Sequence, residues 1–347
     1  MRNYLQIFQD AYIGYYNFLV SEITLTYTYK PLWQNYFYLL ILISLLVFGL
    51  ELLSPWRKEQ PKFRKDFWLD LFYMFFNFFL FSLIIFNAAS QVVVNLFTDA
   101  LAAIGITNLV VIEVQALPFW AYLLVGFVVR DFVQWWIHRL LHKSAFLWEF
   151  HKVHHSVEEM GFAAHFRYHW METVVYKTLE YLPLALIGID LGAFFIIHIF
   201  TLMIGHYNHS NAKFPEWVKG IVFGMLIGFF AAFFAFEASG LGILIIVSLS
   251  TLIGFLLSPV IKYIFNSPEM HIWHHAYDLP EDQENGINFG ISLSCWDYIF
   301  GTSHVPKSGR DIRLGFPGIE EFPKDFGHQF IQGWVPNQKK KKPSDHS

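Results

Sequence analysis

Residues 131–155 read DFVQWWIHRLLHKSAFLWEFHKVHH and hold five histidines. The first two are four residues apart, and the third precedes the last two by three and four residues. On an α-helix, residues three or four apart lie on the same face, so each set would present its imidazoles together. The spacing therefore predicts two helical histidine clusters, formed by His138, His142, His151, His154 and His155.

The same pattern returns later in the chain as His271-Ile-Trp-His274-His275, and His206-Tyr-Asn-His209 lies between the two. Several neutral imidazoles buried together are unfavourable unless their nitrogens find partners, which favours metal binding over a structural role. Imidazole suits zinc, copper, iron and nickel. Ten nitrogen ligands exceed the needs of one four-coordinate ion and fit two ions with open positions. The predicted metal ligands are His138, His142, His151, His154, His155, His206, His209, His271, His274 and His275.

The rest of the composition is typical of a membrane protein. Of 347 residues, 55% are hydrophobic and 15% are charged, against about 45–50% and about 25% in soluble domains. The formal net charge of −4 excludes broad electrostatic binding to nucleic acid. A single cysteine, Cys295, excludes a disulfide framework and a thiolate metal cluster.

Five apolar stretches have the length that membrane crossing requires, which is roughly 20 residues for a helix. The fourth is broken between Pro183 and Gly192 and the fifth at residues 237–240. If the histidine clusters meet at one site, each of these stretches must cross an even number of times, which predicts a helical hairpin for each, or a broken re-entrant pair for 179–205. The alternative, one long tilted helix over 179–205, would put His206 on the wrong face. Residues 1–36 form an amphipathic lead-in without a cleavable signal pattern. The stretches are residues 36–53, 67–86 (or 67–97), 117–137, 179–205 and 221–257.

These features predict an all-α integral membrane protein whose transmembrane hairpins bring the histidines to one membrane surface. We expect N-terminal membrane helices (residues 1–117), a histidine-bearing core (118–302) with an inserted hydrophobic hairpin at 221–257, and a C-terminal tail (303–347). Residues 87–116 carry no Lys or Arg, whereas the segment after the first crossing carries five. Because basic residues favour the cytoplasmic side, the histidine clusters and the tail are expected at the cytoplasmic surface. The five basic residues are Arg57, Lys58, Lys62, Arg64 and Lys65.

The order of these motifs resembles the membrane fatty acid hydroxylase and sterol desaturase superfamily. Two later segments add to the resemblance, Asn288-Phe-Gly290 and Trp296-Asp-Tyr-Ile-Phe-Gly-Thr302. The matching regions are about residues 118–217 and 259–302. The histidine segments that carry the resemblance are Asp131 with Trp135-Trp-Ile-His138-Arg, Trp148-Glu-Phe-His151-Lys-Val-His154-His155-Ser156, His209-Ser-Asn211 and Asn266-Ser-Pro-Glu-Met-His271-Ile-Trp-His274-His275.

The resemblance implies a non-haem di-iron enzyme that uses dioxygen to hydroxylate or desaturate the alkyl part of a lipid or sterol-like substrate taken from the bilayer. It also implies four transmembrane helices in two hairpins below a cytosolic cap, and among the family's branches the chain resembles the alkylglycerol monooxygenase-like bacterial group. The chain has no nucleotide-binding fingerprint, so electrons are expected from a ferredoxin, a cytochrome or a reduced pteridine. The family pattern is broken at Arg167-Tyr-His169-Trp170-Met-Glu172, where tryptophan replaces proline.

Metal-bound histidines usually need a partner for their second ring nitrogen. Candidates for this supporting role are Asp131, His169, Glu172, Asn211, Asp278 and Asn288, with helix capping or loop hydrogen bonding as the plain alternative. An apolar substrate slot, or simply an aromatic belt at the membrane interface, is expected from Trp135, Trp136, Phe162, Phe166 and Trp273. Isolated histidines are expected to be ordinary hydrogen-bonded residues, namely His165, His198, His304, His328 and His346.

Three other classes of protein also use clustered histidines. A non-catalytic metal transporter or sensor would place polar ligands along its spans, but only His198, Asp70, Glu51, Asp190 and Glu237 lie in or near the predicted ones. A membrane b-type cytochrome would use paired histidines. A membrane zinc hydrolase would need fewer ligands and a catalytic Glu motif, which the sequence lacks.

Overall fold

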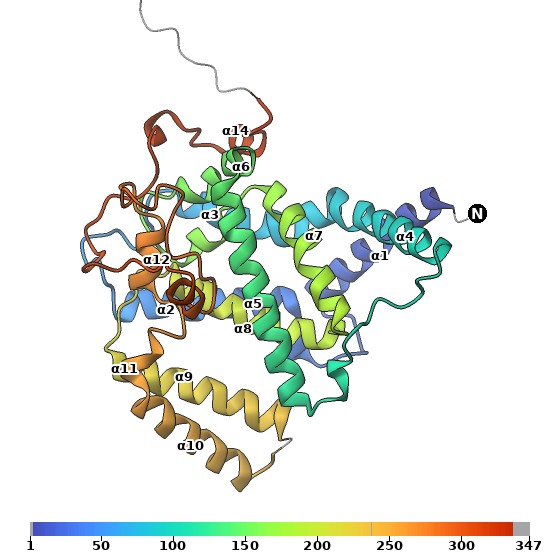
Figure 1. The fold of residues 1–347 in the computed structure, drawn as a ribbon, viewed down its shortest axis with the longest axis horizontal. Helices are drawn as coiled ribbons and strands as arrows, with labels where there is room; N and C mark the ends of the chain where they lie inside the picture. Colours follow the sequence, from blue (N-terminus) through green and yellow to red (C-terminus); the bar gives the residue numbers. More distant parts are fainter. Residues whose placement is uncertain (1–2, 237, 336–347) are drawn as a thin grey trace, which may run out of the picture.

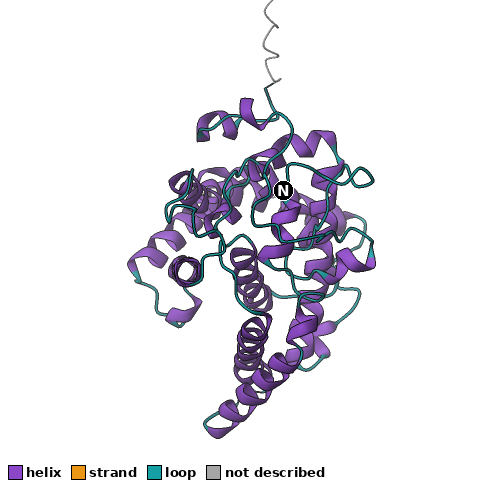
Figure 2. Cartoon of the chain, turned by 90° about the vertical axis from the view of Figure 1, so that its left-hand side faces the viewer, coloured by secondary structure: helices purple, strands orange, loops and turns teal. Residues whose placement is uncertain are grey.

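Helices make up almost all regular structure of the protein (Figure 1, Figure 2). The computed structural model describes residues 3–236 and 238–335. Within these residues no β-strand occurs, and the only extended pairings are three isolated bridges. The predicted all-α architecture is confirmed for this part of the chain, whereas Glu237, His346 and the basic run 339–342 lie outside the described residues.

Short π-helical and 3-10 segments continue or connect the α-helices. The π-helical segments are Phe76–Leu80, Ser82–Phe86 and Ala231–Ala235, and the 3-10 turns are Leu32–Gln34, Val114–Ala116, Phe162–Phe166 and Ile319–Glu321. The α-helices are α1 Tyr4–Thr24, α2 Tyr36–Leu53, α3 Phe67–Phe75, α4 Asn87–Ala103, α5 Phe119–Lys143, α6 Ala145–His155, α7 Trp170–Leu186, α8 Leu191–Asn208, α9 Glu216–Phe230, α10 Leu241–Leu256, α11 Ser258–Ile261, α12 Pro268–His274, α13 Cys295–Ile299 and α14 Phe326–Phe330.

Five helices are long and apolar enough to cross a membrane. The second of them runs without a break from α3 through two π-helical segments into α4, so most of the predicted loop 87–116 is helical. The predicted crossing 117–137 forms α5 but is not among the five, because Arg130, Asp131 and Gln134 interrupt its apolar sequence and are buried in the protein. The five are Tyr36–Leu53, Phe67–Ala103, Leu191–Asn208, Glu216–Phe233 and Leu241–Ile261.

The fourth apolar stretch forms the predicted hairpin, with α7 and α8 as its arms. The irregular part is only residues 187–190, because Pro183 is accommodated inside α7. Asp190 ends this turn and caps α8, since its carboxylate accepts a hydrogen bond from Ala193 N at 2.8 Å. Helix α7 begins beside α6, where Glu172 contacts His151, and runs away from it, whereas α8 runs back to His209, which lies beside His154 and His271 (Figure 1). The hairpin thus returns the chain to the histidine region.

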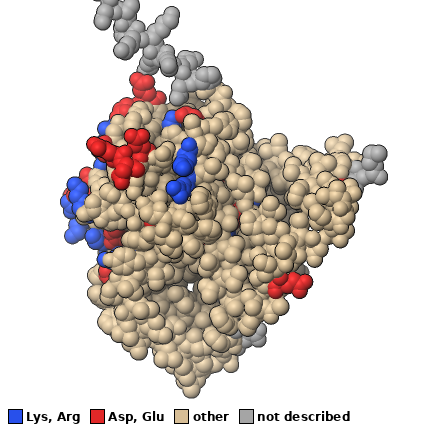
Figure 3. All heavy atoms as spheres, in the orientation of Figure 1, with Lys and Arg blue, Asp and Glu red and all other residues tan. Residues whose placement is uncertain are grey.

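Charged side chains gather at one end of the molecule, near α6 and α12, and most of the visible face has almost none (Figure 3). Ion pairs at this end include Lys65 with Glu158 and Lys324 with Glu158. The basic segment after α2 belongs to the same end, because Trp56 N donates to the Asn211 carbonyl at 2.8 Å. The wide apolar surface fits lipid contact, and the charged end fits an aqueous surface.

Helices α9 and α10 form a second hairpin on the outside of the bundle (Figure 1). Their backbones are in direct contact, since a Cβ atom added at Gly224 would lie 2.3 Å from the Ser250 carbonyl oxygen, and one at Gly220 would lie 2.3 Å from that of Gly254. Small residues allow this close approach, which is the usual way membrane helices gain packing energy. The position of this hairpin as an insertion, and the division of the chain at residues 117 and 302, stay predictions.

Replacing Gly224 by Ala should loosen this hairpin, because the added methyl meets backbone atoms that cannot move aside. We expect a destabilisation of about 1–3 kcal/mol, the usual result of overpacking, measured as a lower midpoint of thermal unfolding in detergent. Gly49→Ala is the matched control within a membrane helix, since nothing lies within 4 Å of its added Cβ. Equal effects of the two substitutions would contradict the close packing of α9 on α10.

Candidate metal centre

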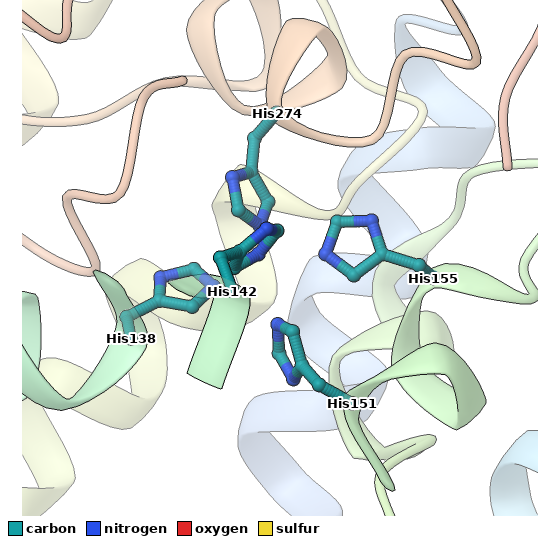
Figure 4. Close-up of side chains that lie close together, drawn as sticks. All are labelled: His138, His142, His151, His155 and His274. Carbon is teal, nitrogen blue, oxygen red and sulfur yellow. The ribbon is translucent and has the colours of Figure 1, made fainter. Parts of the chain in front are cut away.

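Nine histidines converge into two buried groups at the charged end of the bundle. Within each group, ligand nitrogens lie within 4.8 Å of one another. The rings of the first group point toward a common centre from α5, α6 and α12 (Figure 4). The first group is His138, His142, His151, His155 and His274, and the second is His154, His209, His271 and His275.

Local helix geometry explains how the chain forms these groups. The spacing of four on α5 puts His138 and His142 on one face, with their ring centroids 5.3 Å apart. On α6, whose N-terminus is capped by the Ser144 hydroxyl, adjacent histidines point to different groups. The two groups are neighbours, because the His155 and His275 rings stack with centroids 4.4 Å apart.

In the first group, three of the five histidines have an outer ring nitrogen held by a fixed acceptor. His138 Nδ1 donates to the Phe289 carbonyl and His274 Nδ1 to the Ile287 carbonyl, both at 2.8 Å. His151 Nδ1 donates to the Glu172 carboxylate at 2.8 Å. A carbonyl can only accept, so the proton stays on Nδ1 and the Nε2 lone pair of each neutral ring faces the group centre.

The second group contains two lone pairs that face each other. His154 Nδ1 donates to the Arg167 carbonyl at 2.9 Å, and His209 Nδ1 donates to the Gly205 carbonyl at 2.8 Å. Their Nε2 atoms are 3.3 Å apart. With both protons fixed on the outer nitrogens, neither Nε2 of the neutral rings can donate to the other. A cation between them is the arrangement that such a contact fits.

Buried nitrogens without partners support the same conclusion. Among the described residues, the Nε2 atoms of His142, His151, His155 and His274 are buried and make no hydrogen bond. Leaving a buried polar atom unsatisfied costs about 1–3 kcal/mol. Four such atoms facing one centre are explained together if they are ligands of a metal ion.

Burial also fixes the charge state of these histidines. It lowers the pKa of His154 to about 4, and it holds the pKa of His271, His274 and His275 well below the usual value. Neighbouring imidazoles lower the pKa values further, because several positive charges would be close together. The rings are therefore neutral at physiological pH, the form in which they bind metals.

Asn288 holds the loop that carries the two carbonyl acceptors. It lies between Ile287 and Phe289 and has a positive φ of 53°. Its side-chain amide donates to the Met270 carbonyl at 3.0 Å and to the His304 carbonyl at 2.8 Å. Asn288 thus acts on the metal-binding histidines indirectly, through the backbone on either side of it.

His206 is the predicted ligand that the structure does not bring into either group. Its Nδ1 lies 2.8 Å from the Leu202 carbonyl, and its Nε2 lies 3.3 Å from the Ser44 hydroxyl. It has a histidine partner that the sequence analysis treated as ordinary, since His165 Nδ1 lies 3.0 Å from His206 Nδ1. Gly205 makes room for His165, because a Cβ added there would lie 2.6 Å from that ring.

Of the residues predicted to support the ligands, only Glu172 contacts a metal-binding histidine directly. Asp131 accepts hydrogen bonds from Ser292 N, Leu293 N and Trp296 Nε1 and thereby fixes a loop. The other three have different positions: Asn211 binds the backbone of Arg57, His169 caps α7 and reaches the Phe330 carbonyl, and Asp278 is exposed.

Arg167 is a supporting residue that the sequence analysis missed. Its carbonyl holds His154, while its buried guanidinium pairs with Asp70 and Asp66 at the start of the long second membrane helix. Arg64 also pairs with Asp70. The sequence pointed to this contact only through Asp70, an acidic residue in an apolar stretch that follows a basic segment. That position does not specify which arginine Asp70 binds.

A cavity of about 1160 Å³ extends from the histidines along α7 and α8. Histidines of both groups line it, namely His138, His151, His154, His209 and His271. Its wall combines aromatic rings with polar side chains, and Trp135, Trp136, Phe162, Phe166 and Trp273 do not contribute to it, so this cavity does not support the expectation of a substrate slot at these five residues. They pack inside the protein or at its surface instead.

Comparison with known proteins agrees with this centre. The model of the fatty acid hydroxylase family matches residues 123–225 and 214–302, about half of the chain, and these segments include all nine histidines. The chain belongs to the fatty acid hydroxylase family. The predicted relationship is confirmed.

Two relatives of this fatty acid hydroxylase family member have names that refer to a lipid or an aldehyde as the compound acted on. The ornithine lipid hydroxylase OlsE of Rhizobium tropici is 27% identical over 201 residues, which is 58% of this chain and 47% of the relative. The very-long-chain aldehyde decarbonylase GL1-10 of Oryza sativa subsp. japonica is 34% identical over 96 residues, which is 27% of this chain and 32% of the relative. The matches thus span less than half of either relative's length. No solved structure matches the chain.

The metal-free protein should lose stability as the pH falls below about 6.5, the ordinary histidine pKa. The unfolded chain takes up protons there, whereas the folded chain keeps buried rings such as His154 neutral until about pH 4. Each such histidine contributes a loss of about 1.4 kcal/mol per pH unit in this window. Unfolding midpoints of the metal-free protein in uncharged detergent, taken across this range, measure the effect.

His154→Gln should make this pH dependence shallower, because one lowered pKa is removed. His328→Gln should not change it, since that side chain is 73% exposed and paired with Asp325. A wild-type stability that is flat from neutral pH to about pH 5 would contradict the neutral, buried state of these rings.

Two histidines on α8, three residues apart, should differ in their effect on metal content. We expect the wild-type protein to bind two ions per chain and His209→Ala to lose one of them, because His209 belongs to the second group. His206→Ala should retain both ions, since its nitrogens face Leu202 and Ser44. Elemental analysis of the purified variants measures this, and equal metal loss in both would show that His206 is also a ligand.

Proposed function

We propose that this protein is a membrane lipid hydroxylase or desaturase that uses two iron ions, dioxygen and an external electron donor. The observation that carries the proposal is a large aromatic cavity whose end is formed by histidines of both groups. A ligand in the cavity therefore lies next to both candidate metal positions. Membership of the fatty acid hydroxylase family and a relative named as a lipid hydroxylase support a lipid as the substrate.

The donor set fits iron with free coordination positions. Five imidazoles surround the first position and four the second, and imidazole is a good ligand for iron. Iron held there supplies the one-electron chemistry with dioxygen that an unactivated C–H bond requires. Hydroxylation balances as R–H + O₂ + 2 e⁻ + 2 H⁺ → R–OH + H₂O. Desaturation uses the same electrons and protons and releases two water molecules.

The chain's own residues hold and orient the histidine ligands and enclose the alkyl chain of the substrate. The carbonyls of Ile287 and Phe289 and the Glu172 carboxylate keep protons on Nδ1 atoms, so the Nε2 atoms are available as ligands without rearrangement. Aromatic walls such as Phe78 and Phe195 exclude water from the alkyl chain and position it beside the histidines.

We assign the histidine end to the cytoplasmic side of the membrane. The basic segment after α2 is bound to the cap through Trp56 N and Arg57 N, which donate to Asn211. The far end of the bundle includes residues 104–116, which carry no Lys or Arg and contact the end of α7 through Val111 N and the Leu186 carbonyl. This asymmetry follows the positive-inside rule. A ferredoxin, a cytochrome or a reduced pteridine would deliver electrons from that side.

We also propose that residues 118–302 form the catalytic core, residues 1–117 its N-terminal membrane helices and residues 303–347 a cytosolic tail. A non-catalytic transporter or sensor is the competing proposal. It is less well supported, because the nine histidines form compact groups and leave no series of metal ligands along the described spans.

Turnover with isotopically labelled dioxygen tests the proposal. Protein loaded with ferrous iron, supplied with a reductant and the total lipid of a membrane, should yield a lipid that carries the heavy oxygen isotope or has lost two hydrogens, as measured by mass spectrometry. His274→Ala should abolish the product, and the exposed His328→Ala should not. Iron-loaded, reduced protein that modifies no lipid would refute the enzyme and favour the transporter or sensor.

A further inference from the structure

Lys177 carries a positive charge on the cavity wall without an anionic partner. It is on α7, half-buried, and lines the cavity described above. Its ammonium lies 5.0 Å from the centroid of the Tyr181 ring and 5.5 Å from that of Phe194. Within residues 3–236 and 238–335, no ion pair or hydrogen bond joins this ammonium to another group. Its only described contacts are therefore with the faces of aromatic rings.

All other charged groups on the wall of this cavity are engaged. Lys30 pairs with Glu22, and Arg130 pairs with Glu180. The remaining two carboxylates also have partners, because Glu172 accepts from His151, and Asp190 accepts from Tyr122 and caps α8. The lining carries three cations and three carboxylates, and Lys177 is the one among them for which no hydrogen bond or ion pair is described.

A second cation lies close to Lys177 and makes its position less favourable. The Arg130 guanidinium carbon is 5.1 Å from the centroid of the same Phe194 ring. Arg130 pairs with Glu180 and also contacts His198 at 3.3 Å, so this carboxylate is already engaged. Ionisable residues at membrane depth are costly unless they are paired, and those that face a cavity usually bind a ligand. An anion at Lys177 would give its ammonium the partner that it lacks.

The cavity connects this cation to the histidines. Phe194, which the ammonium contacts, and His209, which lines the other end, are fifteen residues apart on one helix. At 1.5 Å per residue, they are separated by about 22 Å along α8. The hydrocarbon core of a bilayer is about 30 Å thick and consists of two opposed layers of lipid chains, so one alkyl chain spans about 15 Å or more. The distance along α8 is therefore of the same order as the length of one alkyl chain.

We propose that Lys177, above the Tyr181 and Phe194 rings, binds the anionic group of a single-chain lipid, a carboxylate or a phosphate, whose alkyl chain extends along α8 toward the histidines. The site accepts the anion through an ammonium that has no competing carboxylate, and the aromatic wall accepts the chain. That this lipid is the substrate rests on the proposed function, but its binding does not.

Equilibrium binding distinguishes the head group from the chain. Radiolabelled hexadecanoate, hexadecyl phosphate and 1-hexadecanol, which share one chain, are added to the full-length protein in uncharged-lipid nanodiscs, and binding to empty nanodiscs is subtracted. We expect the wild type to bind at least one of the two anions about tenfold more tightly than the alcohol, as a charged hydrogen bond provides. The two anions report separately whether the site prefers a carboxylate or a phosphate.

Lys177→Met should remove this preference and leave binding of the alcohol unchanged, which also shows that the cavity is intact. Lys177→Arg should keep the preference, because the charge remains. Lys262→Met is the matched control, since Lys262 makes a similar ring contact, 5.2 Å from the Tyr263 centroid, outside the cavity. Equal wild-type binding of the alcohol and both anions, or a preference that persists in Lys177→Met, would overturn the proposal.

Oxidation of the lipid does not enter this measurement. A protein that binds the anion through Lys177 but never oxidises a lipid would refute the proposed function and leave the anion site in place. A protein that hydroxylates lipids but binds the alcohol as tightly as the anions would refute the anion site and leave the proposed function in place.

Discussion

Neutral imidazoles that face each other with their lone pairs are the constraint on which the whole centre depends. His154 and His209 cannot share a proton, because each already donates its only N–H to a backbone carbonyl. The same tautomer is imposed on His138 and His274. Without a cation, the buried Nε2 atoms of His142, His151, His155 and His274 have no partner among the described residues, which is unfavourable. The fold therefore holds in place a site that a bound metal ion completes.

The loop whose carbonyls fix the histidine tautomers is itself held by α5, the helix that carries His138 and His142. Asp131 on α5 accepts hydrogen bonds from Ser292 N and Leu293 N, and Trp135, one turn further, donates to Asp297 at 3.0 Å. Asp297 in turn accepts from the amides of Phe289 and Gly290. The Phe289 carbonyl then orients His138, which is again on α5. The helix and the loop thus position each other, which gives the ligands little freedom to rotate.

Helical periodicity was enough to predict the histidine faces, because these follow from local spacing, whereas the α7–α8 hairpin was predicted from the condition that the histidine clusters meet at one site. Periodicity could not predict the acceptors of the outer nitrogens, since four of them are backbone carbonyls and carry no residue-specific signal. Neither could it separate His206 from His209, three residues away on the same helix, because the difference depends on which neighbours α8 meets. The helix Phe67–Ala103 extends beyond both predicted ranges, 67–86 and 67–97, because polar residues after Phe86 weaken the apolar pattern without breaking the helix.

The cavity reaches the centre from one side only. Five of the nine histidines line it, and they come from both groups, whereas His142, His155, His274 and His275 are set behind them. An alkyl chain in the cavity therefore meets both candidate metal positions across the same imidazole wall, and the protein encloses the opposite face. Open coordination positions are useful only where a ligand can approach, so they belong on the cavity side. Because one cavity contacts both groups, they are better treated as one candidate site than as two independent structural sites.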